Sequence, residues 1–461
     1  MMEYISTRGG GQPLSFSEVL LAGLARDGGL YLPKTFPNVT AKLAAWRALS
    51  YTDLAFEIMR LYADTIPEPT LRGIVDRSYA TFREAEVTPV REVGPVNILE
   101  LFHGPTLAFK DVALQFLGNL FEYAVSEQGG EMNIVAATSG DTGSAAIYGV
   151  RGKKGLRIFV MHPKGRVSPM QELQMTTVTD ANVRNLAVEG SFDDCQGIVK
   201  ALFNDLDYRD AHKLGAVNSI NWARVLAQIV YYFYAAFRVQ DRTGAAEVDF
   251  TVPTGNFGDI FAGYAAKLMG APIHRLVLAT NENDILSRYF TTGEYSVGTV
   301  VPTLSPSMDI QVASNFERYL YLLSGCDAAK LRGWMESFRA TGTLRPDVPP
   351  DPLFAAGRGD TEKTLETIRR FQAEYGYLLD PHTAVGVSVA LEHQTAGVPM
   401  ICLATAHPAK FAAAVKRATG EDLAHHPILD ALVSLPKRME VMPADAKQVG
   451  DYVDAVIAGR R

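Results

Sequence analysis

The spacing of hydrophobic positions changes near residue 96. Before that point, apolar residues recur at helical intervals over 16–26 and 51–62, with turn-rich stretches between them. After it, short apolar runs alternate with longer segments of helical period. Residues 1–92 are therefore predicted to form a mostly helical N-terminal segment, and residues 93–461 a second region of a different kind.

The alternation beyond residue 96 predicts strands and helices in turn. The apolar runs, each followed by a segment of helical period or a turn-rich loop, are residues 97–102, 133–137, 156–161, 183–188, 248–252, 274–279 and 398–404. This order is typical of the α/β class, with open, mostly parallel sheets covered by helices on both faces. We expect two α/β subdomains, the smaller at about 130–210, and interpret the irregular, helical stretch 291–376 as an insertion.

Composition narrows the class of protein. The chain has 461 residues, 47% of them hydrophobic, and 44 Lys+Arg against 51 Asp+Glu give a net charge of −7. An acidic chain lacks the basic footprint of a nucleic-acid or anionic-membrane partner. With no leader-like start and no long apolar stretch, we expect a cytoplasmic protein. Cys195, Cys326 and Cys402 are too far apart for a disulfide framework and are interpreted as buried hydrophobic residues.

Four loops that follow predicted strands are candidates for chemistry, because open parallel sheets bind ligands beyond the carboxyl ends of their strands. The first, HGPTLAFKD at 103–111, places Lys110 at the start of a helix. The positive end of the helix dipole disfavours a lysine there and tends to lower its pKa. Lys110 is either a lysine that reaches solvent or an amine nucleophile for a carbonyl cofactor.

The second and third loops have the composition of anion-binding turns. ATSGDTGSAA at 137–146 gathers small hydroxyl residues and glycines before a helix, and PTGNFGD at 253–259 holds Gly255 and Gly258 before another. Free N–H groups at a helix start suit a phosphate or carboxylate. Ordinary helix capping and a plain glycine-rich turn are the competing interpretations.

The fourth loop, LATAHPAKF at 403–411, places the hydroxyl of Thr405 directly after a strand, where it could hydrogen-bond a heterocyclic nitrogen. His407 stands beside a proline and is better explained as a structural residue. None of the four loops has the residue spacing of a metal site, and neither the P-loop nor the dinucleotide-binding glycine pattern occurs in them. No metal is therefore expected.

Taken in this order, the four loops resemble those of the pyridoxal-phosphate enzymes of the tryptophan synthase β fold (fold type II), and among these the threonine synthases. YISTRGG at 4–10, DGGLYLP at 27–33 and TLSPSMDIQVASNFER at 303–318 extend the similarity over nearly the whole chain. The resemblance implies a lyase with pyridoxal 5'-phosphate as cofactor. It would convert O-phospho-L-homoserine and water to L-threonine and phosphate by γ-elimination and β-addition of water. A monomer or homodimer is expected.

The resemblance also implies roles for individual residues. Lys110 matches the Schiff-base lysine, and Thr405 matches the hydroxyl beside the pyridine nitrogen. The residues that match the cofactor phosphate loop are Gly255, Asn256, Phe257, Gly258 and Asp259. The residues that match the substrate carboxylate loop are Ser139, Gly140, Asp141 and Thr142. Candidates for the substrate phosphate are Lys164, Ser168, Gln171, Asn221 and Arg224, for which a solvated loop and the polar edge of a helix is the other interpretation.

Three alternatives stay open at this point. The first is another fold-type-II lyase, such as a serine or threonine dehydratase, whose substrate has no γ-phosphate to bind. The second is a homologue that binds the cofactor or a phosphorylated metabolite without turnover. The third is a nucleotide-binding protein that uses PTGNFGD as its phosphate loop, which the missing P-loop lysine disfavours.

Overall fold

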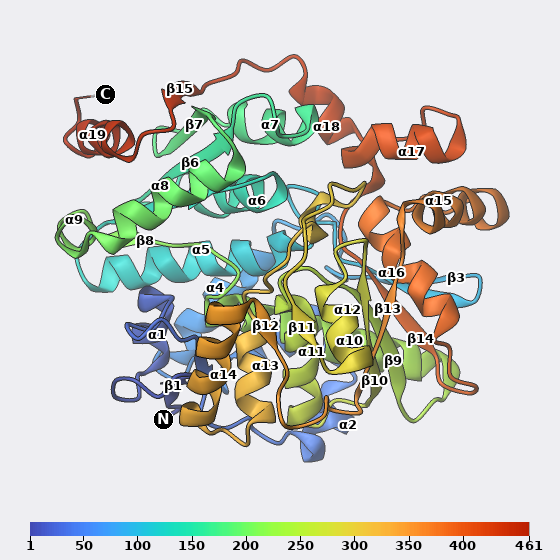
Figure 1. Ribbon diagram of the computed structural model, residues 1–461. Helices are drawn as coiled ribbons and strands as arrows, with labels where there is room; N and C mark the ends of the chain where they lie inside the picture. Colours follow the sequence, from blue (N-terminus) through green and yellow to red (C-terminus); the bar gives the residue numbers. More distant parts are fainter. Residues whose placement is uncertain (461) are drawn as a thin grey trace. The chain divides into compact units, whose positions relative to one another are not determined.

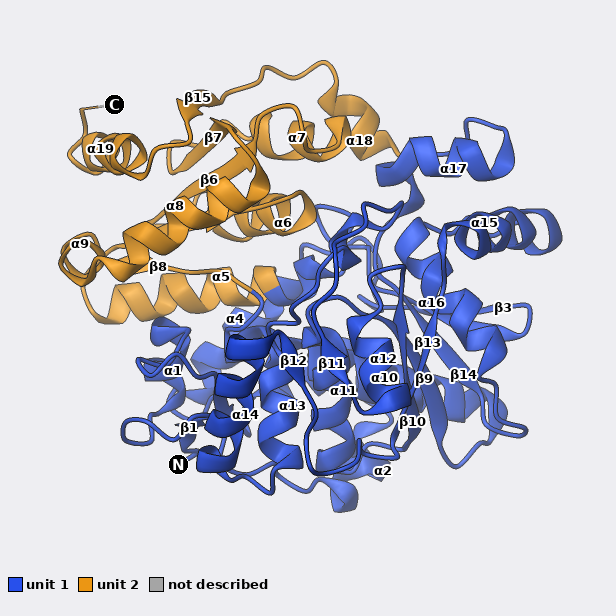
Figure 2. Ribbon diagram, viewed as in Figure 1, with its two compact units in different colours: residues 1–113, 219–425 blue, residues 114–218, 426–461 orange. Residues whose placement is uncertain are grey.

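Residues 1–460 are described in this computed structural model, and the chain divides into two compact units (Figure 2). Unit 1 consists of residues 1–113 and 219–425. Unit 2 consists of residues 114–218 and the C-terminal segment that starts at residue 426. The smaller unit is thus larger than the range 130–210 expected from the sequence, and residues 1–92 are part of unit 1.

Unit 1 contains most of the secondary structure. Its elements are β1 (Tyr4–Ser6), α1 (Phe16–Ala22), β2 (Tyr31–Pro33), η1 (Thr40–Lys42), α2 (Leu43–Trp46), α3 (Tyr51–Met59), α4 (Glu68–Tyr79), β3 (Val90–Val93), β4 (Val96–Glu100), α10 (Trp222–Thr243), β9 (Val248–Pro253), α11 (Gly258–Met269), β10 (Ile273–Thr280), α12 (Ile285–Thr292), β11 (Tyr295–Ser296), η2 (Pro306–Met308), α13 (Phe316–Leu323), α14 (Ala328–Thr341), β12 (Thr343–Leu344), β13 (Phe354–Arg358), α15 (Thr361–Tyr375), α16 (Pro381–Glu392), β14 (Met400–Ala404), η3 (Pro408–Phe411) and α17 (Ala412–Thr419). Helix α5 (Lys110–Glu127) begins in unit 1 and continues in unit 2.

The main sheet of unit 1 has six strands in the order β13-β10-β9-β14-β4-β3 (Figure 1). All neighbours pair in parallel except β3 and β4. Ile98, Val277 and Cys402 belong to the buried cluster that α15 and α16 complete, whereas Phe250 packs its ring against Tyr232 of α10, with centroids 4.9 Å apart. Helices therefore cover both faces, and the predicted α/β class is confirmed.

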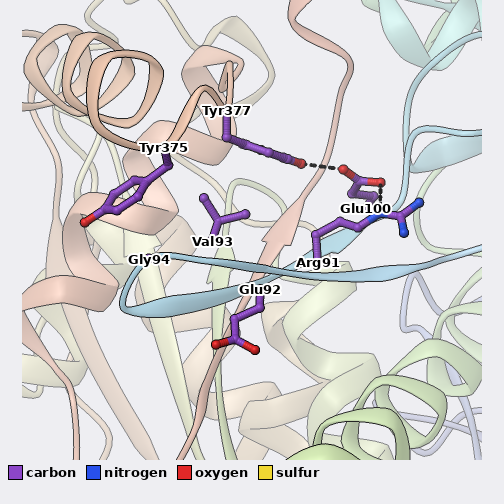
Figure 3. Close-up of a pocket in the computed structure, with 7 residues that line it drawn as sticks. All are labelled: Arg91, Glu92, Val93, Gly94, Glu100, Tyr375 and Tyr377. Atoms are coloured by element: carbon purple, nitrogen blue, oxygen red, sulfur yellow. Dashed lines mark hydrogen bonds and ion pairs between the residues drawn. The ribbon is translucent and has the colours of Figure 1, made fainter.

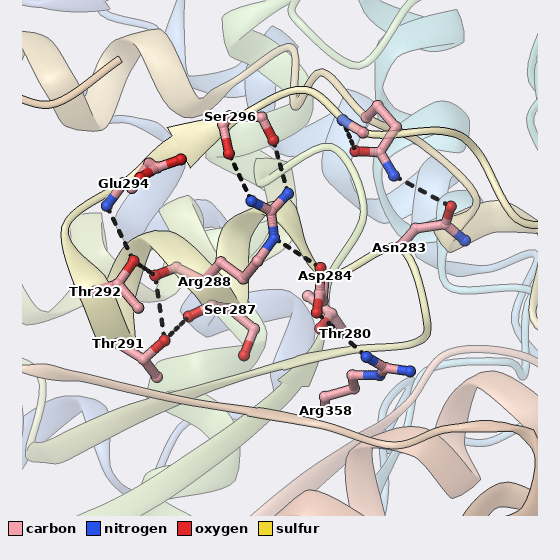
Figure 4. A network of polar contacts seen from close by, with 12 residues as sticks. Thr280, Asn283, Asp284, Ser287, Arg288, Thr291, Thr292, Glu294, Ser296 and Arg358 are labelled. Carbon is pink, nitrogen blue, oxygen red and sulfur yellow. Dashed lines mark hydrogen bonds and ion pairs between the residues drawn. The ribbon is translucent and has the colours of Figure 1, made fainter. Parts of the chain in front are cut away.

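The stretch 291–376, interpreted as a helical insertion, contributes a strand to this sheet. β13 pairs in parallel with β10, with Phe354 opposite Leu276. The start of the stretch is tied to the loop after β10 by a polar network (Figure 4): Arg288 donates to Asp284 Oδ1 at 2.9 Å and to Ser296 Oγ at 2.6 Å. The stretch is thus part of unit 1 and carries the sheet's edge.

Unit 2 is a second parallel sheet. Its elements are β5 (Met132–Ala137), α6 (Asp141–Val150), β6 (Leu156–Pro163), α7 (Pro169–Thr176), β7 (Val183–Glu189), α8 (Phe192–Asn204), α9 (Leu206–Ala211), β8 (Leu214–Gly215), α18 (Pro427–Leu432), β15 (Glu440–Pro443) and α19 (Ala446–Ile457). The strand order is β15-β7-β6-β5-β8. Phe159 and Leu186 on one face pack with Ile198 of α8 and Val453 of α19. The last helix of the chain therefore completes this core.

Two further observations bear on the expectations from composition. No helix among residues 1–460 is both long enough and apolar enough to cross a bilayer. Cys195 and Cys402 are buried, as expected, but Cys326 is exposed, so the expectation was wrong for that residue. Cys326 lies in the turn between α13 and α14.

Candidate active site

Three of the four predicted loops meet at one edge of the main sheet in unit 1. β9 leads into PTGNFGD, β14 leads into Thr405, and β4 leads into the loop that ends at Lys110. These three strands are parallel neighbours in the order β9-β14-β4. Because adjacent strands lie about 4.8 Å apart, the loops at their carboxyl ends are neighbours as well.

The Lys110 loop is fastened to the Thr405 loop through the backbone. The N–H of Phe109 donates to the carbonyl of Thr405 at 2.8 Å, and the N–H of His407 donates to the carbonyl of Leu107 at 3.0 Å. Leu107 has φ of 62°, a left-handed conformation that costs a non-glycine residue energy. Lys110 itself is 8% exposed, so its amine lies within the unit rather than on a solvated face.

A buried carboxylate holds the loop before Lys110 in shape. Asp111 accepts hydrogen bonds from the N–H and the hydroxyl of Thr106, both at 2.7 Å, and Lys410 Nζ donates to the carbonyl of Thr106 at 2.8 Å. Burial raises the pKa of Asp111 to about 6, against the opposing effect of the Thr106 hydrogen bonds and the Lys410 charge. These side chains fix the backbone that presents Lys110.

The glycine-rich loop after β9 has the geometry of an anion cradle. Asn256 Oδ1 accepts from the N–H of Gly258 at 2.9 Å, and α11 begins there. The following N–H groups have no acceptor in the first helical turn, and the helix dipole adds positive potential. A Cβ atom on Gly255 would lie 2.8 Å from the carbonyl oxygen of Ser307, so only glycine fits at this turn.

Phe257 contributes its backbone to this cradle and not its side chain. Its φ is 65°, and its ring is buried against Phe316 and Tyr319 with centroid distances of 5.2 and 5.7 Å. The aromatic packing compensates for the left-handed conformation, which a free loop would avoid. The buried ring of Phe257 therefore holds the loop in this conformation.

The side chain of Asp259 also turns away from the cradle. Its Oδ1 accepts from the hydroxyls of Tyr231 and Tyr232 at 2.5 and 2.9 Å. Burial raises the pKa of Asp259 to about 6, although both tyrosines and the charge of Lys110 act to lower it. A carboxylate would repel a phosphate, so only the N–H of Asp259 suits the role suggested by the sequence.

The loop after β5 in unit 2 is a second, separate cradle. Thr138 Oγ1 accepts from the N–H groups of Gly140 and Gly143 at 3.0 and 2.9 Å. Gly140 has φ of 154°, and a Cβ atom there would collide with the side chain of Gln171. Gln171 Nε2 donates to Asp141 Oδ1 at 2.9 Å, while Ser139 is exposed and Thr142 half-buried.

The residues predicted to bind a substrate phosphate make different contacts in the structure. Lys164 forms an exposed ion pair with Glu189 at 3.0 Å, and Ser168 caps α7. Asn221 is buried, caps α10 and donates to the carbonyl of Leu20 at 3.0 Å. Its side chain is therefore committed to the fold, and this geometry does not favour a substrate role. Arg224 is buried as well, and burial lowers its pKa to about 10.

A cavity of about 480 Å³ between β3, β4 and the end of α15 contains none of these residues (Figure 3). Its buried acid is Glu100, which accepts from Tyr377 at 2.6 Å and contacts His103 Nε2 at 2.9 Å. Burial pushes the pKa of Glu100 upward, but the hydrogen bonds from His103 and Tyr377 hold it below its usual value. The charge of Glu100 is thus compensated within the fold.

Comparison with known proteins places the chain in a family. A family model described as "Threonine synthase N terminus" matches residues 3–79, "Pyridoxal-phosphate dependent enzyme" matches 90–333 and "Threonine synthase, C-terminal" matches 383–453. Threonine synthase of Methylobacillus glycogenes is 47% identical, with 98% of this chain and 99% of that protein covered. The chain belongs to the threonine synthase family. The resemblance seen in the sequence is thereby confirmed.

Solved structures of the threonine synthase family have the same fold. The structure titled PLP bound threonine synthase from Brucella melitensis has a TM-score of 0.94 at 47% identity and covers 99% of both chains. Threonine synthase from yeast has a TM-score of 0.92 at 44% identity, again with 99% of both chains covered. Both likenesses extend over the N-terminal segment and the insertion as well as over the two sheets.

In this member of the threonine synthase family, the segment Asp380 to Thr383 has a role that was not predicted from the sequence. Thr383 Oγ1 accepts from the N–H of Thr405 at 3.2 Å and donates to Asp380, whose Oδ1 lies 3.0 Å from His382 Nδ1. His382 Nε2 accepts from the N–H of Ser307 at 3.2 Å. The segment thus connects the Thr405 loop to the turn that backs Gly255. Asp-Pro at a helix start was a visible signal for the helix, but not for this connection.

Proposed function

We propose that the chain converts O-phospho-L-homoserine and water to L-threonine and phosphate, with pyridoxal 5'-phosphate as its cofactor. One observation carries the proposal most directly. A buried lysine, a glycine cradle at a helix start and a strand-end hydroxyl stand at the ends of the adjacent parallel strands β4, β9 and β14. A phosphorylated aldehyde cofactor with a ring nitrogen needs these three groups.

The residues of unit 1 fit this cofactor. Lys110 would hold its aldehyde carbon covalently, the N–H groups from Gly255 to Asp259 would hold its phosphate, and Thr405 would donate to its ring nitrogen. Thr405 follows β14 and is only 6% exposed, so water would compete little for that contact. When bound, the cofactor supplies the electron sink for carbanion chemistry.

The chain's own part in the reaction is to bind, orient and move protons. The substrate amine would take the place of the Lys110 amine, which would then move protons at Cα and Cβ of the substrate. General acid–base catalysis requires a group that lies close enough to the proton and has an appropriate pKa. The backbone hydrogen bonds between the Lys110 loop and the Thr405 loop hold the lysine in place for this role. The cradle of Ser139, Gly140, Asp141 and Thr142 is proposed for the substrate carboxylate, and Arg224 and Lys164 for the phosphate that leaves from Cγ.

The test compares Lys110→Ala with Lys363→Ala. Lys363 forms an exposed ion pair with Glu392 in the same unit, so its loss controls for removing a lysine. The visible absorption of the purified proteins with added cofactor is recorded first, and threonine and phosphate release from phosphohomoserine is measured next. We expect Lys363→Ala to behave like the wild type and Lys110→Ala to lose both the bound absorption band and turnover.

Two results would contradict the proposal. A wild-type protein that takes up no cofactor would refute the cofactor assignment, and turnover of serine or threonine in preference to phosphohomoserine would assign it to the dehydratases. The phosphate assignment is tested separately by Arg224→Gln. We expect it to raise KM for phosphohomoserine by about tenfold or more, since a buried charge-assisted contact is lost, and an unchanged KM would remove Arg224 from the site.

A further inference from the structure

Asp259 has a feature that the cofactor-phosphate role does not explain. The hydroxyls of Tyr231 and Tyr232 both donate to the same carboxylate oxygen, Oδ1. The other oxygen, Oδ2, is buried and has no hydrogen-bond partner among residues 1–460. A buried carboxylate oxygen without a donor is costly and calls for an explanation such as a partner that arrives during function.

The two tyrosines that donate to Oδ1 are themselves held by further hydrogen bonds. Gln228 Nε2 donates to the Tyr231 hydroxyl at 3.1 Å, which leaves the proton of that hydroxyl for Asp259. Tyr232 donates in addition to the backbone carbonyl of Asp259 at 3.0 Å. Burial keeps the pKa of both tyrosines well above their ordinary value, so both remain donors. The carboxylate is therefore held in one orientation through Oδ1, and both α10 hydroxyls leave Oδ2 without a donor in the described part of the chain.

A buried cation acts on Asp259. Among the described residues, the titratable groups that act on it are Tyr231 and Tyr232 from α10 and Lys110 from the start of α5. Arg224 is not among these groups, and the charge that acts on Arg224 is that of Tyr231. The charge of Lys110 acts to lower the pKa of Asp259, and because both groups are buried, solvent screens this attraction poorly.

We propose that Asp259 is a positioning residue for Lys110, with Oδ2 as the counter-charge and hydrogen-bond acceptor that directs the Lys110 nitrogen toward the reacting carbons. The proposal rests on the proposed function, because the nitrogen of Lys110 is the proton carrier there. A negative Asp259 stabilises the protonated form of that nitrogen. It thereby sets the pH at which the lysine takes up and releases its proton.

The readout is the pH midpoint of the change in visible absorption of the holoenzyme, which reports protonation at the Lys110 nitrogen and does not depend on turnover. Asp259→Asn and Asp259→Ser both remove the charge. We expect each to lower the midpoint by about one pH unit or more, because the protonated nitrogen loses its counter-charge. We also expect kcat for phosphohomoserine to fall by about tenfold while KM changes little.

Tyr231→Phe is the matched control, since it breaks the same contact between α10 and α11 and retains the carboxylate. Its midpoint should stay closer to that of the wild type than the midpoint of either neutral variant. If both neutral variants keep the wild-type midpoint within a few tenths of a unit, or if Tyr231→Phe shifts it as far as they do, the proposal is overturned. Cofactor uptake and phosphate release by the wild type are measured first, so that failure of the proposed function is recognised separately.

Discussion

At the scale of single residues, two buried side chains fix the backbone conformation of the loops that form the candidate site. Leu107 and Phe257 adopt left-handed conformations with φ of 62° and 65°, and both are nearly inaccessible to solvent. Glycine would adopt this conformation at no cost, but it would also leave it freely. Apolar packing therefore makes the two loops rigid where glycine would have made them mobile.

Asp111 gives a prediction for the dependence of stability on pH. Burial raises its pKa from 3.8 in the unfolded chain to about 6, so the folded state binds a proton more tightly. Its contribution to stability is present at low pH and is lost as the pH rises through about 6. Asp111→Asn removes this contribution and one acceptor for Thr106. We expect the variant's loss of stability to be larger at pH 5 than at pH 8, by about 1 kcal/mol.

Thermal unfolding at the two pH values measures this difference. The wild type serves as the reference at each pH, and catalysis is not involved in the readout. An equal or smaller loss of stability at pH 5 would mean that Asp111 is not the group that binds the proton.

At the scale of elements, the N-terminal segment is held to α13 by buried polar contacts. Arg8 pairs with Glu317 at 2.8 Å, Thr7 donates to Glu317 at 2.6 Å, and Arg318 donates to the carbonyl of Tyr31 at 2.7 Å. These contacts join YISTRGG and DGGLYLP to SNFER. Three motifs far apart in the sequence thus meet at α13, the helix whose Phe316 and Tyr319 also pack against Phe257.

We expect Arg8→Ala to destabilise the protein by about 2 kcal/mol, because the poorly accessible Glu317 loses its counter-charge. Lys34→Ala is the control, since Lys34 pairs with Glu3 where both side chains are more than half exposed, and its effect should be within about 0.5 kcal/mol. Melting temperatures of the two variants are compared. Similar melting temperatures would show that burial of the Arg8–Glu317 ion pair adds nothing to the stability of the protein.

The turn at Gly255 gives a prediction for cofactor affinity. Alanine at this position would place a methyl group 2.8 Å from the Ser307 carbonyl, which the backbone cannot tolerate without moving. We expect Gly255→Ala to weaken cofactor binding by about tenfold or more, since the cradle N–H groups would be displaced. Gly333→Ala is the control, because a Cβ atom there meets nothing within 4 Å and the position lies inside α14. The measurement is a titration of the cofactor-free proteins, and equal affinities would contradict the expectation.

The loops of the candidate site were predictable because they are local. A strand, a glycine or hydroxyl turn and a helix start follow each other within ten residues in HGPTLAFKD and PTGNFGD. The partners Tyr231, Asp380 and His382 were not predictable, since they gain their roles only when strand pairing brings distant loops together. β13 was missed for another reason: its FAAGR sequence is short, weakly apolar and preceded by prolines that indicate a loop.

At the scale of the whole molecule, unit 2 is a core completed by a distant segment. Val453 and Tyr452 of α19 pack with Cys195 and Ile198 of α8. We expect Val453→Asp, which buries a charge in this core, to destabilise unit 2 by several kcal/mol. Val433→Asp is the control, since Val433 is 68% exposed in the same C-terminal segment.

Amide hydrogen exchange measures the effect region by region. For Val453→Asp, faster exchange should extend over residues 114–218 and the segment from 426, with unit 1 protected as in the wild type. Faster exchange throughout both units would mean that the chain unfolds as one body, contrary to its division by contacts. Val433→Asp should exchange like the wild type everywhere.

The division of unit 2 between two distant segments has a consequence for biosynthesis. A ribosome releases residues 114–218 well before β15 and α19, which complete their sheet and cover it. The nascent chain must therefore leave uncovered the part of α8 that packs against α19 while more than two hundred further residues, 219–425, are added. Unit 2 can therefore mature only after α19 has left the ribosome, and its uncovered apolar surface makes the preceding interval one in which chaperones protect the chain from aggregation.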